Sequence, residues 1–234
     1  MSAVLHVISD RTRHRSPLLE ALVLSAEGGA DVIQIREKKA PVSETYSLVT
    51  ELQRQLFAKQ QSPAVFVNDR VDVAFAANLA GVHLASKSLP IPVVDQLRRR
   101  VNWSGQIGCS VHSLDEALAA EQAGADYVTF GHIYSSESHP GMPPCGLYAL
   151  RRVVEALSIP VIAIGGIDRS NLAPVLETNC SGVAVIGAVV SAANPLEATR
   201  TLKEIINDSP ALPKIPFAQH QGVSNKGKEE SYYD

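Results

Sequence analysis

The sequence predicts a single (β/α)8 barrel, the TIM-barrel class of α/β folds. Eight short segments rich in β-branched residues alternate with eight helix-like segments along the chain. The links between them are short, so we expect the strands to pair in parallel. A chain of 234 residues also suits one barrel. A doubly wound open sheet is the competing fold, but no Gly-x-Gly-x-x-Gly motif follows the first strand segment.

The expected strands are apolar runs that end in polar residues or glycine, at 4–9, 31–37, 64–70, 81–85, 106–112, 127–130, 160–167 and 182–187. The expected helices lie at 18–27, 43–59, 71–79, 93–101, 113–122, 147–157 and 168–178, with a last one that begins at 194–195. Ser43 and Asp168 are expected helix caps, and Ser113 with Glu116 forms a capping box. Pro195 suits a first helical turn.

The composition is that of an ordinary globular protein, with 45% hydrophobic and 19% charged residues. The net charge of -3 is spread along the chain, which argues against a nucleic-acid surface. No apolar run reaches the ~18 residues of a membrane span, and the N-terminus does not resemble a signal peptide. The three cysteines, Cys109, Cys145 and Cys180, form no disulfide framework and no metal-ligand spacing. We therefore expect a cytoplasmic protein.

We expect residues 1–207 to form one barrel domain and residues 208–234 a flexible polar tail. Pro210, Pro213 and Pro216 interrupt structure there, and the last residues are polar. Barrels of this size often form homo-oligomers, and the sequence leaves that open.

His132 stands at the end of the sixth expected strand, directly after Gly131. Barrels place their chemistry at the carboxyl ends of strands, and imidazole exchanges protons near neutral pH. The alternative is a loop histidine bonded to a backbone carbonyl. His139 lies in the proline-rich loop that follows, which is a candidate lid.

Glycines follow the seventh and eighth strands, as Gly165-Gly166 and Gly187-Ala188. Barrels often bind phosphate at this place with bare backbone amides, because a Cβ would hold the anion away. The alternative is that these glycines only turn the chain.

Four polar residues end strands two, three and five: Arg36, Asn68, Asp69 and Ser110. Arg36 is a candidate anion anchor, or it pairs with Glu37 or Asp69. Asn68 and Asp69 either bind a metal or support Arg36, and two such residues are a weak metal signal. We predict no metal site. Three further histidines are weaker candidates for a functional role. His83 alternates with apolar residues and is expected in the barrel interior, and His112 is expected to cap a helix or to bond a loop. We predict no role for His6.

Several motifs together resemble the thiamin phosphate synthase superfamily. These motifs are QIREK at 34–38, VNDR at 67–70, GVHL at 81–84, SVHSLDEA at 110–117, GADY at 124–127, PVIAIGGI at 160–167 and VAV at 183–185. The resemblance covers roughly the first 205 residues, and it implies a barrel that acts on a phosphorylated thiazole.

The sequence departs from the synthase branch of that superfamily at three places. Ser88 stands where the synthases carry an aspartate that helps to hold magnesium pyrophosphate, and the loop 135–140 lacks their lysine. Gly131-His132 replaces their Gly-Pro and resembles the thiazole tautomerase branch instead. The resemblance therefore implies a thiazole tautomerase, an isomerase that aromatises a thiazole carboxylate phosphate without a cofactor.

In that reading His132 transfers the proton, and Arg36 holds the substrate carboxylate. The amides of Gly165, Gly166, Gly187 and Ala188 hold the phosphate, while Asn68 and Ser110 orient the ring or His132. Two alternatives stay open. One is thiamin phosphate synthase, a magnesium-dependent transferase that joins hydroxymethylpyrimidine pyrophosphate to thiazole phosphate. The other is a thiazole-phosphate-binding regulatory protein without turnover.

Overall fold

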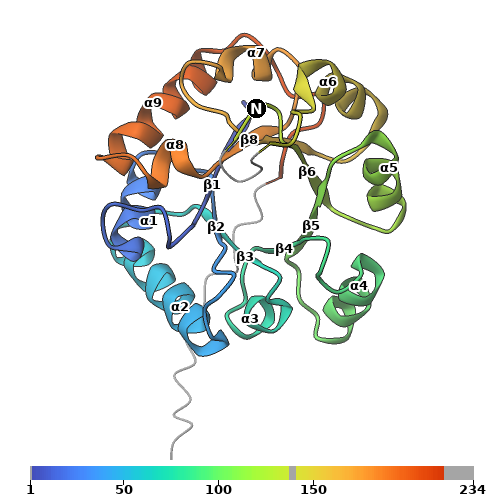
Figure 1. The fold of residues 1–234 in the computed structure, drawn as a ribbon. Helices are drawn as coiled ribbons and strands as arrows, with labels where there is room; N and C mark the ends of the chain where they lie inside the picture. The colour runs from blue at the N-terminus through green and yellow to red at the C-terminus, as the bar shows by residue number, and fades with distance from the viewer. Residues whose placement is uncertain (1, 137–140, 219–234) are drawn as a thin grey trace, which may run out of the picture.

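A computed structural model describes residues 2–136 and 141–218. Eight parallel strands close into a barrel in chain order, from β1 to β8. The ring closes where β1 pairs with β8, with Val4 opposite Gly182 and Val7 opposite Val185. The helices surround the strands, as the view along the barrel shows (Figure 1). The predicted (β/α)8 barrel is confirmed.

The strands are β1 Val4–Ile8, β2 Val32–Ile35, β3 Ala64–Asn68, β4 Gly81–Leu84, β5 Gln106–Val111, β6 Tyr127–Gly131, β7 Val161–Ile164 and β8 Gly182–Val185. The helices are α1 Leu18–Glu27, α2 Val42–Ala58, α3 Val71–Ala76, α4 Ile91–Arg100, α5 Leu114–Gln122, α6 Gly146–Ala156, α7 Leu172–Leu176, α8 Gly187–Val190 and α9 Pro195–Asp208. The short α8 directly after β8 was not expected from the sequence.

Helix starts were predicted with mixed success. The Ser113 cap is confirmed, because its Oγ accepts a hydrogen bond from the backbone of Glu116 at 3.1 Å. Ser43 is not a cap, since α2 already begins at Val42. Asp168 is not a cap either, because it accepts hydrogen bonds from Ser170 in a turn. Helix α7 begins at Leu172, and its N-cap residue is Asn171.

The hydrophobic core has two layers. Most buried residues fill the space between strands and helices, and a smaller cluster fills the barrel interior. Two glycines make room for large rings there. A Cβ at Gly81 would lie 2.4 Å from the Phe66 ring, and one at Gly108 would lie 2.0 Å from the Tyr127 ring. Each large ring in the barrel interior therefore fits because a glycine on the neighbouring strand leaves the space that a side chain would take.

The segment after α9 contributes to this interior. Phe217 is only 4% exposed, and its ring centroid lies 5.2 Å from that of Tyr127 and 6.3 Å from that of Phe66. The Lys214 ammonium donates hydrogen bonds of 2.6–3.0 Å to three carbonyls at the end of α6, and its backbone N–H donates to Asn179. The division into a barrel of 1–207 and a flexible tail of 208–234 stays a prediction, and residues 219–234 lie outside the described part.

Candidate active site

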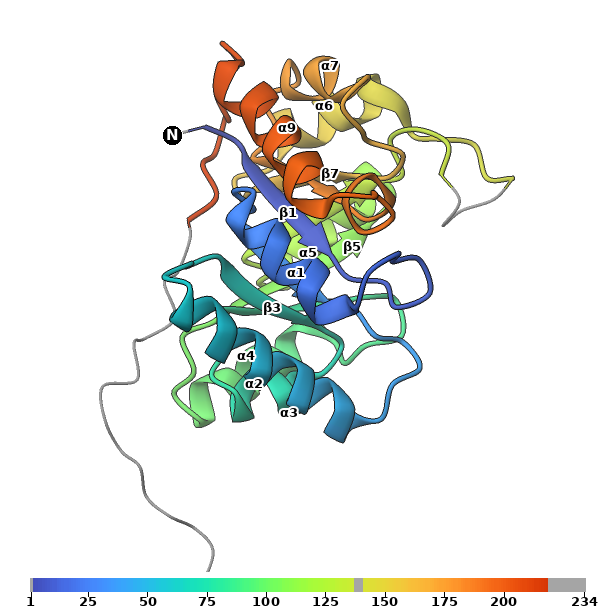
Figure 2. The same cartoon turned by 90° about the vertical axis from the view of Figure 1, so that its left-hand side faces the viewer.

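A cavity of about 640 Å³ opens at the carboxyl ends of the strands. Every predicted site residue lines it, and the set comprises Arg36, Asn68, Ser110, His132, Gly165, Gly166, Gly187 and Ala188. Seen from the side, the loops that follow the strands gather at one end of the barrel (Figure 2). The eight residues come from strands far apart in sequence, so the closed barrel is what brings them together.

A hydrogen-bonded chain holds the carboxylate of Asp69 at one side of the cavity. Asn68 Nδ2 donates to Asp69 Oδ2 at 2.6 Å, and Gln34 donates to Asn68 Oδ1 at 3.0 Å. The Ser88 hydroxyl donates to the other oxygen, Oδ1. Both carboxylate oxygens of Asp69 therefore accept hydrogen bonds. Ser88 contributes a hydroxyl donor to this carboxylate and adds no second carboxylate.

Arg36 has a different carboxylate partner from the two considered above. Its Nη1 lies 3.9 Å from Asp10 Oδ2, whereas Glu37 pairs with Arg11 at 2.6 Å. Lys38 lines the cavity on the same side, and the positive charge of Arg36 together with burial lowers the pKa of its ammonium. A cluster of cations at the end of β2 suits an anionic ligand.

A second chain of hydrogen bonds runs from the barrel interior to the cavity. The Tyr127 hydroxyl lies 3.0 Å from His83 Nδ1, and His83 Nε2 lies 2.9 Å from Ser110 Oγ. Burial raises the pKa of Tyr127 and lowers that of His83 to about 4, so the phenol and the imidazole are both neutral at pH 7. A neutral imidazole donates from one nitrogen and accepts at the other, so His83 links the Tyr127 hydroxyl to the Ser110 hydroxyl at the cavity.

His132 is 4% exposed and lines the cavity, and its Nε2 lies 3.2 Å from the carbonyl oxygen of Met142. The backbone carbonyl of His132 also accepts a hydrogen bond from Cys145 N–H at 2.8 Å. Both contacts hold the loop between β6 and α6. His112 has a similar structural contact, with its Nδ1 2.6 Å from the carbonyl of Gly131. His139 lies outside the described residues.

The glycine turns lie on the opposite side of the cavity from Asp69's strand. Gly165 and Gly166 have φ of 104° and 66°, which favours glycine. A Cβ at Gly165 would lie 2.3 Å from the His132 Cβ, so this turn also requires glycine for packing. Both readings of these glycines, as a chain turn and as a surface of bare amides, are compatible with the geometry.

Three charged residues that line the cavity were not predicted as site residues: Arg13, Lys38 and Asp168. Lys38 had a usable signal, since it lies two residues after Arg36 at the end of a strand. Arg13 belongs to a long first loop with no motif of its own. Among residues 2–136 and 141–218, no three His, Cys, Asp or Glu side chains come together as a metal site.

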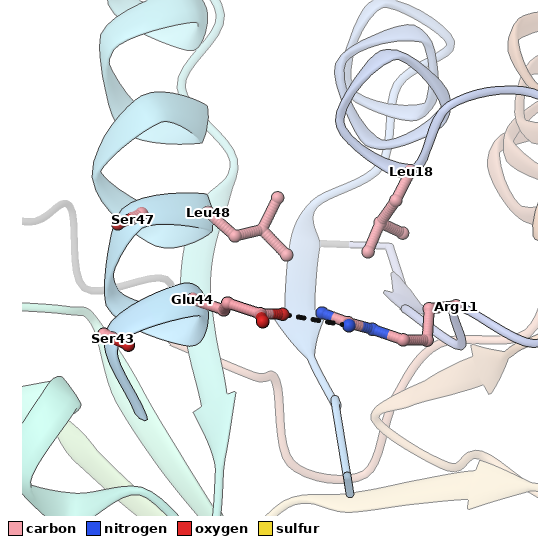
Figure 3. A pocket seen from close by; sticks show the side chains of 6 residues that line it. All are labelled: Arg11, Leu18, Ser43, Glu44, Ser47 and Leu48. Atoms are coloured by element: carbon pink, nitrogen blue, oxygen red, sulfur yellow. Dashed lines mark hydrogen bonds and ion pairs between the residues drawn. The ribbon is translucent and has the colours of Figure 1, made fainter. Parts of the chain in front are cut away.

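A second hollow lies on the outside of the barrel, between α1 and α2 (Figure 3). Leu18 and Leu48 face each other across it, and Arg11 pairs with Glu44 at 3.1 Å below them. Arg11 also pairs with Glu37, so its charge is already balanced by two carboxylates. This hollow contains none of the predicted site residues.

Comparison with known proteins decides the family. The family model described as thiamine monophosphate synthase matches residues 5–189. The chain belongs to this family. The thiamine-phosphate synthase of Pyrococcus furiosus is 41% identical over 87% of this chain and 95% of its own length. That of Chlorobium luteolum is also 41% identical, over 90% of this chain and 96% of its own.

The fold agrees with that relationship. A solved thiamine phosphate pyrophosphorylase from Pyrococcus furiosus superposes with a TM-score of 0.79 at 39% identity, over 88% of this chain and 96% of the other. No helix in the described ranges is long and apolar enough to cross a membrane. The cytoplasmic location stays a prediction.

The predicted thiazole tautomerase, and with it the isomerase class, is wrong. The named relatives at about 40% identity are thiamine-phosphate synthases, and the alternative given above fits them better. That prediction rested on Ser88, on the lack of a lysine in the loop 135–140 and on Gly131-His132. In the structure His132 has a structural contact, because its Nε2 lies within hydrogen-bond distance of the backbone carbonyl of Met142.

Proposed function

We propose that this protein is a thiamine-phosphate synthase, a transferase that joins hydroxymethylpyrimidine pyrophosphate to thiazole phosphate and releases pyrophosphate. The observation that carries the proposal is the 41% identity to a synthase over 95% of that enzyme. The cavity supports it, because its size and its lining of cations and glycine turns suit two phosphorylated substrates.

The two anionic groups fit different sides of the cavity. The amides of Gly165, Gly166, Gly187 and Ala188 suit the monophosphate of the thiazole. Arg36 and Lys38, at the end of β2, suit the pyrophosphate. Asn68 and Ser110 then orient the substrate between them.

His132 lines the cavity and would therefore lie beside the bound substrates. Its role as a proton shuttle belonged to the tautomerase hypothesis and is dropped with it. The contact with Met142 gives it a positioning role, since it ties the residue after β6 to the segment that precedes α6.

Magnesium is implied by this reaction, and the acidic side of the cavity fits it in part. Magnesium is commonly held by one or two carboxylates together with substrate phosphates and water. Asp69 supplies one carboxylate, and the Ser88 hydroxyl contacts it where the synthases have a second acid. Asp69 would hold the ion, which when bound neutralises the leaving pyrophosphate. With one carboxylate fewer, we expect the protein alone to bind magnesium weakly and to hold the ion only together with the phosphates of the substrate.

The test is an assay of the full chain with both substrates, with magnesium and with the metal chelated. We expect thiamine phosphate to form only with magnesium. Arg36→Gln should lower kcat/KM for the pyrophosphate substrate by ~10- to 100-fold, because a charge-assisted hydrogen bond is lost. Arg54→Gln is the matched control, since Arg54 is exposed on α2 and pairs with Glu51.

Two outcomes would count against the proposal. If no thiamine phosphate forms at millimolar magnesium, the transferase reading fails. If both phosphorylated substrates still bind, the remaining reading is a binding protein without turnover. Equal effects of the Arg36 and Arg54 variants would remove Arg36 from the site but leave the reaction in place.

A further inference from the structure

Arg13 brings a positive charge to the glycine side of the cavity. It lies in the loop between β1 and α1, its side chain is 22% exposed, and it lines the cavity. Its Nη1 is 3.9 Å from the place that a Cβ on Gly187 would occupy. The guanidinium therefore lies beside the first residue of α8, Gly187, which has no side chain.

Asp10 holds Arg13 in this place. The backbone N–H of Arg13 donates to the Asp10 carbonyl at 3.0 Å, and Arg13 Nε lies 3.4 Å from Asp10 Oδ2. Thr12 donates to Asp10 Oδ1 from its hydroxyl at 2.6 Å and from its backbone at 3.1 Å. Burial opposes ionisation of Asp10, but the Thr12 hydrogen bonds and the charges of Arg13 and Arg36 outweigh it and lower the pKa. Asp10 is therefore a charged, fixed anchor at neutral pH.

The same carboxylate also separates two arginines. Asp10 Oδ2 lies 3.4 Å from Arg13 and 3.9 Å from Arg36. Arg36 is at the end of β2 with Lys38, and Arg13 is next to Gly187 at the end of β8. Because β1 lies between β2 and β8 in the barrel, the two guanidiniums are placed on either side of Asp10. The cavity thus has two cationic positions rather than one merged patch.

We propose that Arg13 binds the phosphate of the thiazole substrate and makes the site select phosphorylated over unphosphorylated thiazole. This inference rests on the proposed function and deepens it. The backbone amides of the Gly165-Gly166 turn and of Gly187 and Ala188 in α8 can bind an anion, but they carry no full charge. A guanidinium adds that charge and up to two parallel hydrogen bonds to phosphate oxygens. Arg36 then serves the pyrophosphate of the other substrate.

The competing explanation is that Arg13 only stabilises the loop through Asp10. Ligand discrimination separates the two explanations. A phosphate-binding arginine affects only ligands with a phosphate, whereas a structural arginine affects both thiazoles to the same extent. Binding of each thiazole alone is measured by calorimetry, without the pyrimidine substrate and without magnesium, so no turnover is required.

Arg13→Gln is expected to weaken thiazole phosphate binding about 10- to 100-fold, as for a lost charge-assisted hydrogen bond. Binding of the unphosphorylated thiazole alcohol should change less than about twofold. Arg15→Gln is the matched control, because Arg15 is an exposed arginine of the same loop that does not line the cavity. Arg13→Lys keeps the charge without the planar fork and should give an intermediate loss.

Several results would overturn the inference. They are an equal loss for both thiazoles, no loss in Arg13→Gln relative to Arg15→Gln, or a wild-type protein that does not prefer the phosphorylated ligand. If Arg13→Gln does not fold, the Arg13→Lys variant decides by the same comparison. A protein that forms no thiamine phosphate but still discriminates through Arg13 would refute the proposed reaction and leave this inference intact.

Discussion

Acid should destabilise this barrel from the inside, because two histidines are buried in it. His6 is fully buried, and burial together with the charge of His83 lowers its pKa to about 3. Burial also lowers the pKa of His83 to about 4. In the unfolded chain both groups have pKa values of about 6.5. Between pH 6.5 and pH 4 the unfolded state therefore binds protons that the folded state does not.

The sign and the size of the effect follow from proton linkage. A lowered histidine pKa means that stability is complete above pH 6.5 and is lost as the pH falls toward 4. Each histidine contributes a slope of up to about 1.4 kcal/mol per pH unit. At pH 5 this amounts to about 2 kcal/mol for each, or ~4 kcal/mol for both. Asp10 and Asp72 also have lowered pKa values, but they act mainly below about pH 4.

The assay is urea unfolding at pH 7.5 and pH 5.0, followed by the fluorescence of Trp103, the only tryptophan. His6→Leu is an informative variant, because neither ring nitrogen of His6 has a hydrogen-bond partner within the described residues. It should keep stability at pH 7.5 and halve the loss at pH 5.0. An unchanged free energy of unfolding between the two pH values would refute the reasoning, as would equal losses in variant and wild type.

Two further predictions concern stability, and both use urea unfolding at pH 7.5. Tyr127→Phe should cost about 1–3 kcal/mol, because it leaves Nδ1 of buried His83 without its partner at 3.0 Å. Tyr148→Phe, at a residue 78% exposed, should change stability by less than ~0.5 kcal/mol, and a similar loss in both would contradict the hydrogen-bond chain. Phe217→Ala should cost roughly 3–5 kcal/mol through an interior cavity. Leu212→Ala, at a residue 63% exposed, is its control, and equal small effects would show that Phe217 does not support the barrel.

The barrel was predictable because its signals are local and repeated. Each strand is an apolar run with a turn behind it, and the rule that strand ends share one mouth placed all eight predicted residues around one cavity. Arg13 could not be found in this way. It reaches the cavity from a loop, and its position depends on Asp10 rather than on a strand register.

The dipeptide Gly131-His132 could not decide between a tautomerase and a synthase. Gly131-His132 is a poor discriminator, since an imidazole at that place also has a structural use in holding Met142. Ser88 also pointed away from the synthases, and the structure shows only that its hydroxyl donates to Asp69. The partner of Arg36 was missed for a geometric reason: Asp10 is remote in sequence and reaches it from the neighbouring strand's loop.

The buried ring of Phe217 has a consequence for folding during synthesis. A chain is synthesised from its N-terminus, so Phe217 follows all eight strands, the last of which ends at Val185. The strands are therefore complete before the ring that contacts Phe66 and Tyr127 is available. During that interval the interior rings of Phe66 and Tyr127 lack the partner that covers them in the folded barrel, and exposed apolar surface of this kind promotes aggregation.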